Sequence, residues 1–380
     1  MVEGERRLFR GGAVAKMEQG RRTRGFGKPG LQGRAPVWPR CAAMAVGSMP
    51  HTSPREAMDL VLAATPEIPA WPQLPRRSYL ESMYVQFTEG LPGRVLDVAA
   101  EKMHVLSEVP GDEAAAFLEA LEVGDPGLFA LSPEYAAGIP ELLKALQQVS
   151  PPFVKGQVTG PVSFGLTVTD ENRRAILYDD TLRDISTRLL TAKALWQERL
   201  LATAAPASVA LIMFDEPFLT QFGSGFISIP EDISLPLLVE CMSAVSCLTG
   251  IHVCGGTDWT KVARLPVDVL NFDAADHLES LLGHAEAVAA FVEEGGLLAW
   301  GSVPNDERAM TLTAVEVADT ILEGAHVLAA AGCADVGRIL TVSFVCPACG
   351  TGGLARPVAE RCLTLAADTS AHLRAAWPDL

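Results

Sequence analysis

Residues 209–216 read Val-Ala-Leu-Ile-Met-Phe-Asp-Glu, an apolar run that ends in two carboxylates. The run shows no alternation of apolar and polar residues, which is typical of a parallel strand covered on both faces. Its carboxylates stand where enzymes built on parallel strands place reactive groups, at the carboxyl end. The stretch therefore predicts an α/β protein whose functional side chains follow its strands.

Similar apolar runs recur along the chain and alternate with amphipathic stretches such as Arg183–Ala204 and Ala309–Ala331. We expect strands at Ala45–Met49, Ile68–Leu74, Phe153–Val158, Val209–Phe214, Gly250–Cys254, Asp268–Phe272, Leu297–Val303 and Ile339–Val345. Eight strands alternating with helices predict a single (β/α)8 TIM barrel with its active site at the carboxyl ends of the strands. An open doubly wound sheet is the alternative, although no Gly-x-Gly-x-x-Gly follows the first strand.

Charge is unevenly distributed along the chain. The net charge is −16, yet residues 1–43 hold ten Lys/Arg and three Asp/Glu, a balance of +7, which leaves −23 for the rest. An acidic body argues against nucleic acid as a partner. We interpret residues 1–43 as a disordered leader or a start assigned too early, since Met44 precedes the first predicted strand, and a transit peptide is a third interpretation. Residues 44–380 are expected to form the barrel.

Targeting and cysteine content give the expected compartment. The leader has no apolar export segment, and no run of eighteen apolar residues predicts a membrane span. The eight cysteines need not form disulfides in a chain of this size. We therefore expect a cytoplasmic protein with reduced thiols and no membrane partner.

His252 and Cys254 end the fifth predicted strand as a His-x-Cys pair. Strand side chains alternate with period two, so both side chains point to one side, and imidazole with thiolate suits Zn²⁺. A buried cysteine beside a hydrogen-bonded histidine is the alternative. Cys349, after the eighth strand, opens onto the same barrel mouth and favours a catalytic zinc site. Cys346 and Cys349 could instead form a redox pair or half of a structural zinc site.

An acidic residue after the sixth strand is the candidate fourth ligand. Asp273 is the first choice and Asp276 the reserve, and a hydrogen-bonded loop aspartate is the alternative for either. Zn²⁺ with two thiolates and one carboxylate has a charge of 2 − 3 = −1, which keeps a bound substrate sulfur electron-rich. The ligand set therefore favours alkylation of a thiol over hydrolysis.

Five motifs follow one another in the order found in the catalytic barrel of cobalamin-independent methionine synthase, which the chain resembles over residues 44 to 370. These motifs are Gly47-Ser48-Met49-Pro50-His51-Thr52, Val158-Thr159-Gly160-Pro161-Val162-Ser163, Phe214-Asp215-Glu216-Pro217, His252-Val253-Cys254 and Pro347-Ala348-Cys349-Gly350. The resemblance is to the short core form of that family and implies methyl transfer to the thiol of homocysteine, forming methionine.

The resemblance also implies roles for individual residues. The zinc ligands would be His252, Cys254, Asp273 and Cys349, with Asp where the family has Glu. Asp215 would bind the amino group of homocysteine and act with His252 as a catalytic residue. The implied substrate contacts are Ser48 for the carboxylate, Glu81 for the amino group, and Glu216 beside Asp215.

The methyl donor implied by the resemblance is methylcobalamin or a corrinoid protein. Leu166-Thr167-Val168 stands where the fused synthases have a Trp-Ser-Phe that helps to bind folate, so folate is disfavoured. Three alternatives are a corrinoid-dependent methyltransferase for another thiol such as coenzyme M, a uroporphyrinogen decarboxylase-like enzyme, and a zinc- or corrinoid-binding protein without turnover. A uroporphyrinogen decarboxylase-like enzyme would need arginine-rich recognition of carboxylates, and the amino-terminal signature of that enzyme is absent from this sequence.

Overall fold

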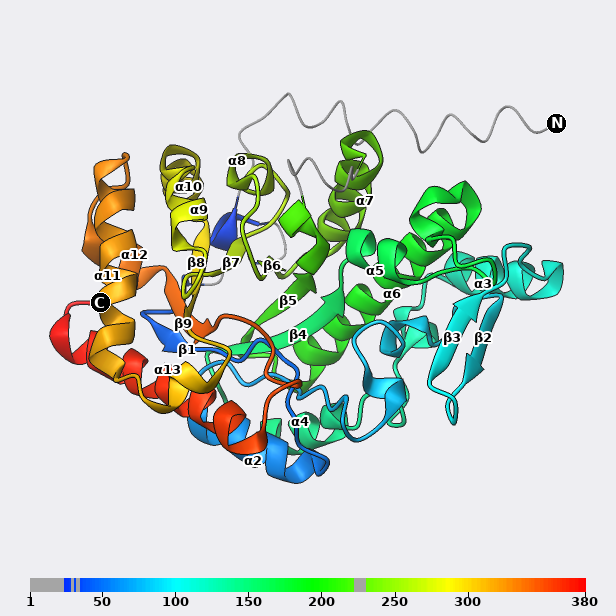
Figure 1. The fold of residues 1–380 in the computed structure, drawn as a ribbon, viewed down its shortest axis with the longest axis horizontal. Coiled ribbons are helices and arrows are strands. Elements are labelled where there is room, and N and C mark those ends of the chain that lie inside the picture. The colour runs from blue at the N-terminus through cyan, green and yellow to red at the C-terminus, as the bar shows by residue number, and fades with distance from the viewer. Residues whose placement is uncertain (1–23, 29–30, 32–34, 222–229) are drawn as a thin grey trace.

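The structure is a computed structural model that describes residues 24–28, 31, 35–221 and 230–380. Its centre is a curled sheet of seven parallel strands in the order β1-β9-β8-β7-β6-β5-β4, with helices packed around it (Figure 1). The strands are β1 Ala42–Ala43, β4 Phe153–Thr159, β5 Val209–Asp215, β6 Leu248–Val253, β7 Val269–Asp273, β8 Leu297–Val303 and β9 Ser343–Pro347. Every residue of these strands is buried, as the continuous apolar runs predict.

The helices follow the strands as the alternating pattern predicts. They are α2 Pro54–Ala64, α3 Gly111–Val123, α4 Gly138–Leu146, α5 Pro161–Thr167, α6 Asp180–Ala204, α7 Glu231–Ala244, α8 Trp259–Val262, α9 Leu278–Leu282, α10 Ala285–Glu293, α11 Ala314–Ala330, α12 Val336–Thr341 and α13 Arg356–Ala376. An antiparallel hairpin, β2 Arg94–Asp97 and β3 Lys102–Val105, stands beside α3 away from the main sheet (Figure 1).

The second predicted strand, Ile68–Leu74, forms no continuous ladder. Two isolated parallel bridges replace it, one joining Ala70 to Lys155 of β4 and one joining Gln73 to Ser48. Pro69 and Pro72 lie in this segment, and proline has no backbone N–H to donate to a ladder. The segment therefore runs between the two edges of the sheet as extended chain with few strand hydrogen bonds.

Two other predicted strands are displaced. The first, Ala45–Met49, is wrong in its bounds because the paired residues are Ala42–Ala43, after which the chain crosses from β9 to the bridge at Ser48. The eighth, Ile339–Val345, begins too early. Its first residues belong to α12, where the Asp335 side chain accepts a hydrogen bond from the Arg338 N–H and starts a helix.

The two long predicted helices form, with different starts. α6 begins at Asp180 because the Asp179 carboxylate accepts hydrogen bonds from the next backbone N–H groups. The predicted start of α11 at Ala309 is wrong, since residues 307–310 form a separate 3-10 turn. Thr313 and Glu316 form a capping box that fixes the start of α11 at Ala314.

The described residues before Met44 pack against the amino-terminal end of the sheet. The buried guanidinium of Arg24 donates to the carbonyl oxygens of Ala263, Leu265 and Val267 at 2.6–3.0 Å. Lys28 pairs with Asp268 at 2.7 Å. The predicted boundary between residues 43 and 44 is therefore not marked by a break in packing.

Candidate metal centre

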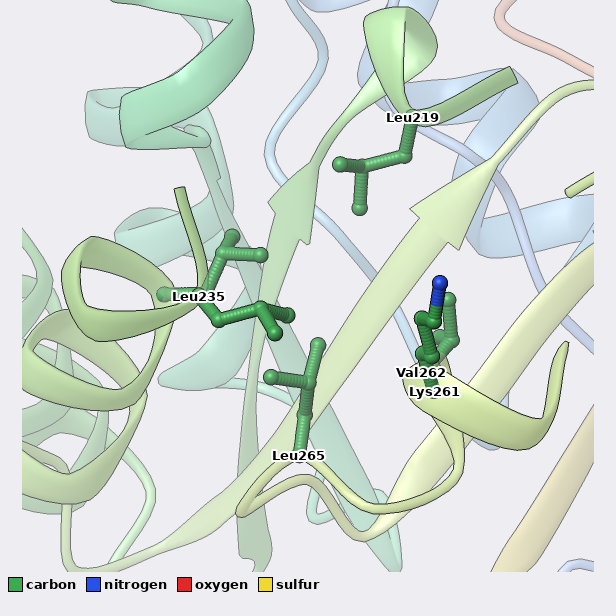
Figure 2. Close-up of a pocket in the computed structure, with 6 residues that line it drawn as sticks. Leu219, Leu235, Lys261, Val262 and Leu265 are labelled. Carbon is green, nitrogen blue, oxygen red and sulfur yellow. The ribbon is translucent and has the colours of Figure 1, made fainter. Parts of the chain in front are cut away.

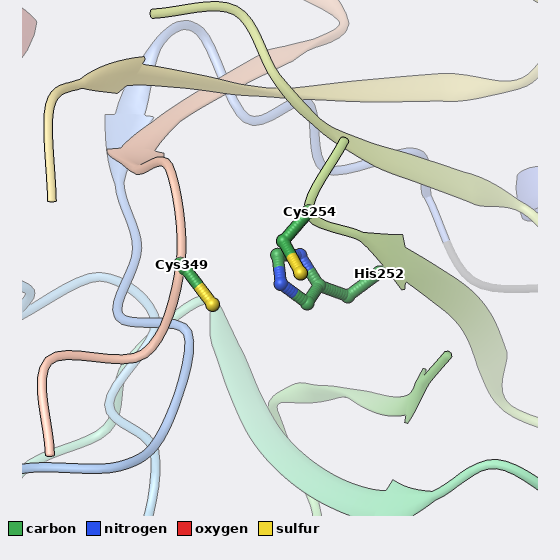
Figure 3. Close-up of side chains that lie close together, drawn as sticks. All are labelled: His252, Cys254 and Cys349. Atoms are coloured by element: carbon green, nitrogen blue, oxygen red, sulfur yellow. The ribbon is translucent and has the colours of Figure 1, made fainter. Parts of the chain in front are cut away.

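Three side chains of types that can bind a metal meet at the carboxyl ends of two strands that are not neighbours in the sheet. His252 is the penultimate residue of β6, Cys254 directly follows that strand, and Cys349 follows β9. Their ligand atoms all lie within 4.8 Å of one another, and Figure 3 shows the imidazole and both sulfurs converging. The curled sheet brings together residues almost a hundred positions apart, so this group could be predicted only with the expected barrel arrangement and not from spacing alone.

The hydrogen bonds of His252 leave one ring nitrogen for a metal. Nδ1 lies 2.7 Å from Oδ1 of Asn271, whose Nδ2 donates to the Ala299 carbonyl at 2.9 Å and to the Cys346 sulfur at 3.1 Å. These acceptors fix the amide orientation, so Nδ1 carries the hydrogen and Nε2 keeps its lone pair. Nε2 is buried and has no hydrogen-bond partner among the described residues. An orphaned buried nitrogen beside two sulfurs fits a metal ligand.

The two sulfurs of the group are coupled. The pKa of the Cys254 thiol is lowered because its sulfur accepts a hydrogen bond from Cys349, and the same bond together with burial raises the pKa of Cys349. Cys346 does not join the group: its sulfur is buried against Asn271, and burial raises its pKa to about 12. Of the predicted Cys-x-x-Cys pair, the structure brings only Cys349 to the metal group.

Neither candidate for the fourth ligand lies in the group that the described residues form. Oδ1 of Asp273 accepts the Asp276 backbone N–H at 2.9 Å, and its other oxygen lies 3.9 Å from Nε2 of His277. The exposed Asp276 carboxylate is held by both terminal nitrogens of Arg308 at 2.6 and 2.7 Å. The acidic loop after β7 is thus bonded within itself and to the loop after β8.

Asp215 ends β5 and is the direct register partner of His252 on β6. It is 8% exposed, and its Oδ1 has no hydrogen-bond partner among the described residues. Burial raises the pKa of this carboxyl, while the charges of His252 and Lys155 lower it. A buried oxygen with a free lone pair next to the metal group can accept an N–H from a ligand.

Glu216 is fully buried and already occupied. Its carboxylate accepts the backbone N–H groups of Val162 and Ser163 and the Ser163 hydroxyl, at 2.6–2.9 Å. Burial raises the pKa of Glu216 to about 7, and these donors oppose the rise. A Cβ at Gly160 would lie 2.2 Å from the carboxylate, so glycine is required there. Glu216 therefore anchors the start of α5.

The other two predicted substrate contacts occupy different places. Ser48 lies against the loop that follows Cys349, with its hydroxyl accepting the Gly352 N–H at 3.3 Å and its carbonyl accepting the Thr351 N–H at 2.8 Å. Glu81 is buried beside Arg77 and accepts the Leu74 N–H at 3.2 Å, and burial raises its pKa. Ser48 thus adjoins the metal group, whereas the Glu81 carboxylate binds its own loop.

Two residues of the site carried no role in the sequence predictions. Asn271 orients His252, and an amide in the middle of a predicted buried strand was the available signal. Lys155 is a charged residue within the apolar run Phe153–Val158, and full burial of a lysine in β4, a strand at the edge of the sheet, is unusual.

One cavity lies away from the metal group. Figure 2 shows a small apolar cavity of about 10 Å³ at α7 and α8, lined by Leu219, Leu235, Leu238, Lys261, Val262 and Leu265. That volume is about the space of one water and holds no substrate. Among the described helices none is both long and apolar enough to cross a membrane.

The fold is similar to that of a B12-independent methionine synthase from Shewanella sp. W3-18-1, solved in complex with selenomethionine. The TM-score is 0.57 and the sequence identity 16%, over 90% of this chain and 99% of that chain. At this identity the likeness shows a shared fold. No protein-family model and no curated protein matches the sequence.

Proposed function

We propose that this protein is a zinc-dependent methyltransferase that transfers a methyl group to the thiol of homocysteine and forms methionine. The observation that carries the proposal is the convergence of His252, Cys254 and Cys349, with the orphaned Nε2 of His252 facing the sulfurs. Two thiolates and one neutral imidazole form the donor set of a zinc centre with an open position. The structural likeness to a methionine synthase supports the same activity.

Zinc bound by these three side chains would lower the pKa of a substrate thiol and keep it deprotonated near neutral pH. The protein's part is to hold the ligands: Asn271 fixes the His252 tautomer, and the β6 and β9 ends set the sulfurs. For Asp273 to be the fourth ligand, its carboxylate would have to leave the Asp276 N–H. Three ligands otherwise leave one position for the substrate sulfur.

Substrate recognition rests on two of the four predicted contacts. The unpartnered Oδ1 of Asp215 would accept the ammonium group of homocysteine, and Ser48, beside the Cys349 loop, would bind its carboxylate. Asp215 would act with His252 as the catalytic pair of the site. Glu216 would contribute by anchoring α5, and Glu81 by fixing the loop after residue 74. The neighbouring synthase holds selenomethionine, a ligand with the same amino-acid end.

The donor is proposed to be methylcobalamin, free or on a corrinoid protein. No aromatic side chain stands in Leu166-Thr167-Val168 at the end of α5 to stack on a pterin ring. We place the reaction in a reducing compartment, the cytoplasm, because all eight cysteines are free thiols in the structure.

We also propose that residues 68–74 fill the eighth strand position and close the barrel. The two isolated bridges join this segment to β4 at Ala70 and to the β1 side at Gln73. Further backbone bonds run from Lys155 N to the Pro69 carbonyl at 3.1 Å and from Gln73 N to the Gly47 carbonyl at 3.1 Å. The prolines reduce the number of ladder bonds without moving the segment out of this gap.

A coenzyme M methyltransferase would share the zinc chemistry, but the sulfonate of coenzyme M would meet the buried carboxylate of Asp215 rather than a cation. A zinc- or corrinoid-binding protein without turnover would not need that carboxylate.

The test of the proposed function is methionine formation by zinc-loaded protein given homocysteine with methylcobalamin or, in parallel, methyltetrahydrofolate. Turnover with methylcobalamin alone supports the proposal. Methylation of coenzyme M in place of homocysteine, or of neither thiol, contradicts it.

A further inference from the structure

Ser48 lies in a segment that is bonded to the loop following β9. The Ser48 carbonyl accepts the Thr351 N–H at 2.8 Å and the Thr351 hydroxyl at 3.0 Å. The hydroxyl oxygen of Ser48 accepts the Gly352 N–H at 3.3 Å, so its hydrogen can be donated to a ligand. A Cβ at Gly350 would lie 2.2 Å from the same oxygen, and a glycine there permits the close approach. One side of Ser48 is thus held by the loop that carries a candidate metal ligand.

Gln73 holds the same segment from the other side. Its N–H donates to the Gly47 carbonyl at 3.1 Å, and its carbonyl accepts the Met49 N–H at 2.8 Å. Gly47 has a φ of +154°, and a Cβ there would lie 3.1 Å from Oε1 of Gln73. The backbone on both sides of Ser48 is therefore fixed by contacts with a neighbouring stretch of extended chain.

Lys155 bonds the start of this segment from β4. It is 1% exposed, and its Nζ donates to the Val46 carbonyl at 2.6 Å and to Oε1 of Gln157 at 3.1 Å. Gln157 lies on the same face of β4, because side chains alternate along a strand. Its Cδ would lie 3.2 Å from a Cβ at Gly47. Lys155 and Gln157 therefore contact the two residues that precede Ser48.

Packing alone does not account for a lysine at position 155. Burial of an ammonium group costs several kcal/mol unless it is compensated, and a carbonyl and an amide oxygen compensate only in part. An apolar side chain of similar length would fill the volume without that cost. It would leave the buried Val46 carbonyl without the donor that Lys155 provides. The lysine is therefore explained by the backbone that it holds.

We propose that Lys155 is a positioning residue: its hydrogen bond to the Val46 carbonyl places Ser48 so that the Ser48 hydroxyl meets the carboxylate of the amino-acid substrate. This inference rests on the proposed function, in which Ser48 binds that carboxylate. A thiol without a carboxylate does not use the Ser48 hydroxyl and should not depend on Lys155.

The test is calorimetric binding of two thiols to zinc-loaded, full-length protein. Homocysteine and 3-sulfanylpropan-1-amine share the thiol and the amine and differ only in the carboxylate. Lys155→Met should weaken homocysteine binding about 5- to 20-fold, leave 3-sulfanylpropan-1-amine within about twofold, and leave zinc content unchanged. Lys193→Met, the matched control at a buried lysine of α6, should change none of these.

A double substitution separates the positioning of Ser48 from a general effect on the fold. Ser48→Ala removes the hydroxyl that Lys155 is proposed to place. Adding Lys155→Met to Ser48→Ala should then weaken homocysteine binding by no more than about twofold further. Losses that add in full would show that Lys155 does not act through Ser48, and would overturn the inference.

Amide hydrogen exchange tests the positioning without any substrate. The N–H groups of Met49 and Thr351 form hydrogen bonds on either side of Ser48. Both should exchange faster in Lys155→Met than in Lys193→Met, because the segment between them loses one of its attachments. Equal exchange in the two variants would show that Lys155 does not hold this segment.

The outcomes separate the two proposals. If the unmodified protein binds no homocysteine, the proposed function fails, while the exchange comparison still decides whether Lys155 positions Ser48. If it binds homocysteine, and Lys155→Met binds it normally or weakens both thiols equally, the inference is overturned. Lys155→Gln, whose amide can still donate toward the Val46 carbonyl, enters the same comparison if the methionine variant does not fold.

Discussion

Buried aspartates at the two ends of the sheet differ in whether their carboxylate oxygens have hydrogen-bond partners. At the amino-terminal end, Asp268 accepts the Gly25 and Thr249 N–H groups, each at 2.8 Å, and pairs with Lys28. At the carboxyl-terminal end, Asp215 is nearly as buried, yet its Oδ1 has no partner among the described residues. A satisfied carboxylate stabilises the fold, whereas an unsatisfied one reserves its lone pair for a ligand. Substitutions at the two ends should therefore separate stability from binding.

The largest expected effect is on activity at Asp215. Asp215→Asn should lower kcat/KM for homocysteine about 100- to 1000-fold, because an amide cannot balance the substrate ammonium charge, and should leave thermal stability nearly unchanged. The measurement is steady-state kinetics beside a thermal melt. A variant that loses several kcal/mol of stability with normal kcat/KM would contradict the assignment of Asp215 to binding.

Asp268→Asn should show the reverse pattern. Its carboxylate pairs with the partly buried Lys28, and removal of one partner leaves the ammonium without its anion. We expect a loss of about 2–4 kcal/mol in the free energy of unfolding, with zinc content and KM unchanged in the folded protein. Denaturant titration gives the first quantity and metal analysis the second. Loss of zinc at a normal unfolding free energy would show that the two ends are not independent.

Substitution of Lys193 tests how burial of a lysine changes its pKa and the stability of the fold. Its Nζ donates to the Phe129 carbonyl at 3.2 Å, and burial lowers its pKa to about 7. The unfolded chain keeps the ordinary pKa near 10.4, so the unfolded state binds more protons between these values and stability rises with pH there. Lys193→Met should be more stable than the unmodified protein below pH 7, and the difference should shrink by up to about 1.4 kcal/mol per pH unit above it. Denaturant titrations from pH 6 to pH 9 measure this, and a difference independent of pH would refute the burial argument.

The smallest effect is expected at Arg24. Arg24→Ala removes hydrogen bonds to three carbonyl groups and a stacking contact with Phe291, whose ring centroid lies 4.7 Å from the guanidinium carbon. The loss should be about 1–2 kcal/mol, since water that fills the space left by the buried guanidinium can replace part of this bonding. Kinetics should not change. Equal stability of the variant would show that the contacts of Arg24 do not contribute to the stability of the fold.

Sequence patterns predicted the parallel strands β4 to β8 because their apolar runs are long and end in polar residues. They failed where local hydrogen bonding decides the element: prolines interrupt Ile68–Leu74, a capping box moves the start of α11, and a side-chain cap starts the helix α12 where a strand was expected. An apolar run indicates that a segment is buried, but it does not distinguish a strand from the inner face of a short helix.

In the candidate site, too, some features could be predicted from the sequence and others could not. His252, Cys254 and Cys349 could be predicted to meet, since they follow strands that share one mouth. The bonding of Asp273 to the Asp276 N–H in its own loop and the use of Glu216 to anchor α5 could not, because the sequence does not show which groups these carboxylates bond. Residue types in the sequence show which side chains could bind a metal or a substrate. Only the folded structure shows which of them have no hydrogen-bond partner within the protein.

The central claim is that His252, Cys254 and Cys349 bind zinc, and metal stoichiometry in two cysteine variants tests it most directly. Cys349→Ser should lose bound zinc and all methyl transfer, because it removes one of three converging ligand atoms. Cys346→Ser, three residues away with its sulfur turned to Asn271, should keep one zinc per chain. Full zinc occupancy in Cys349→Ser, or its loss only in Cys346→Ser, would contradict the account.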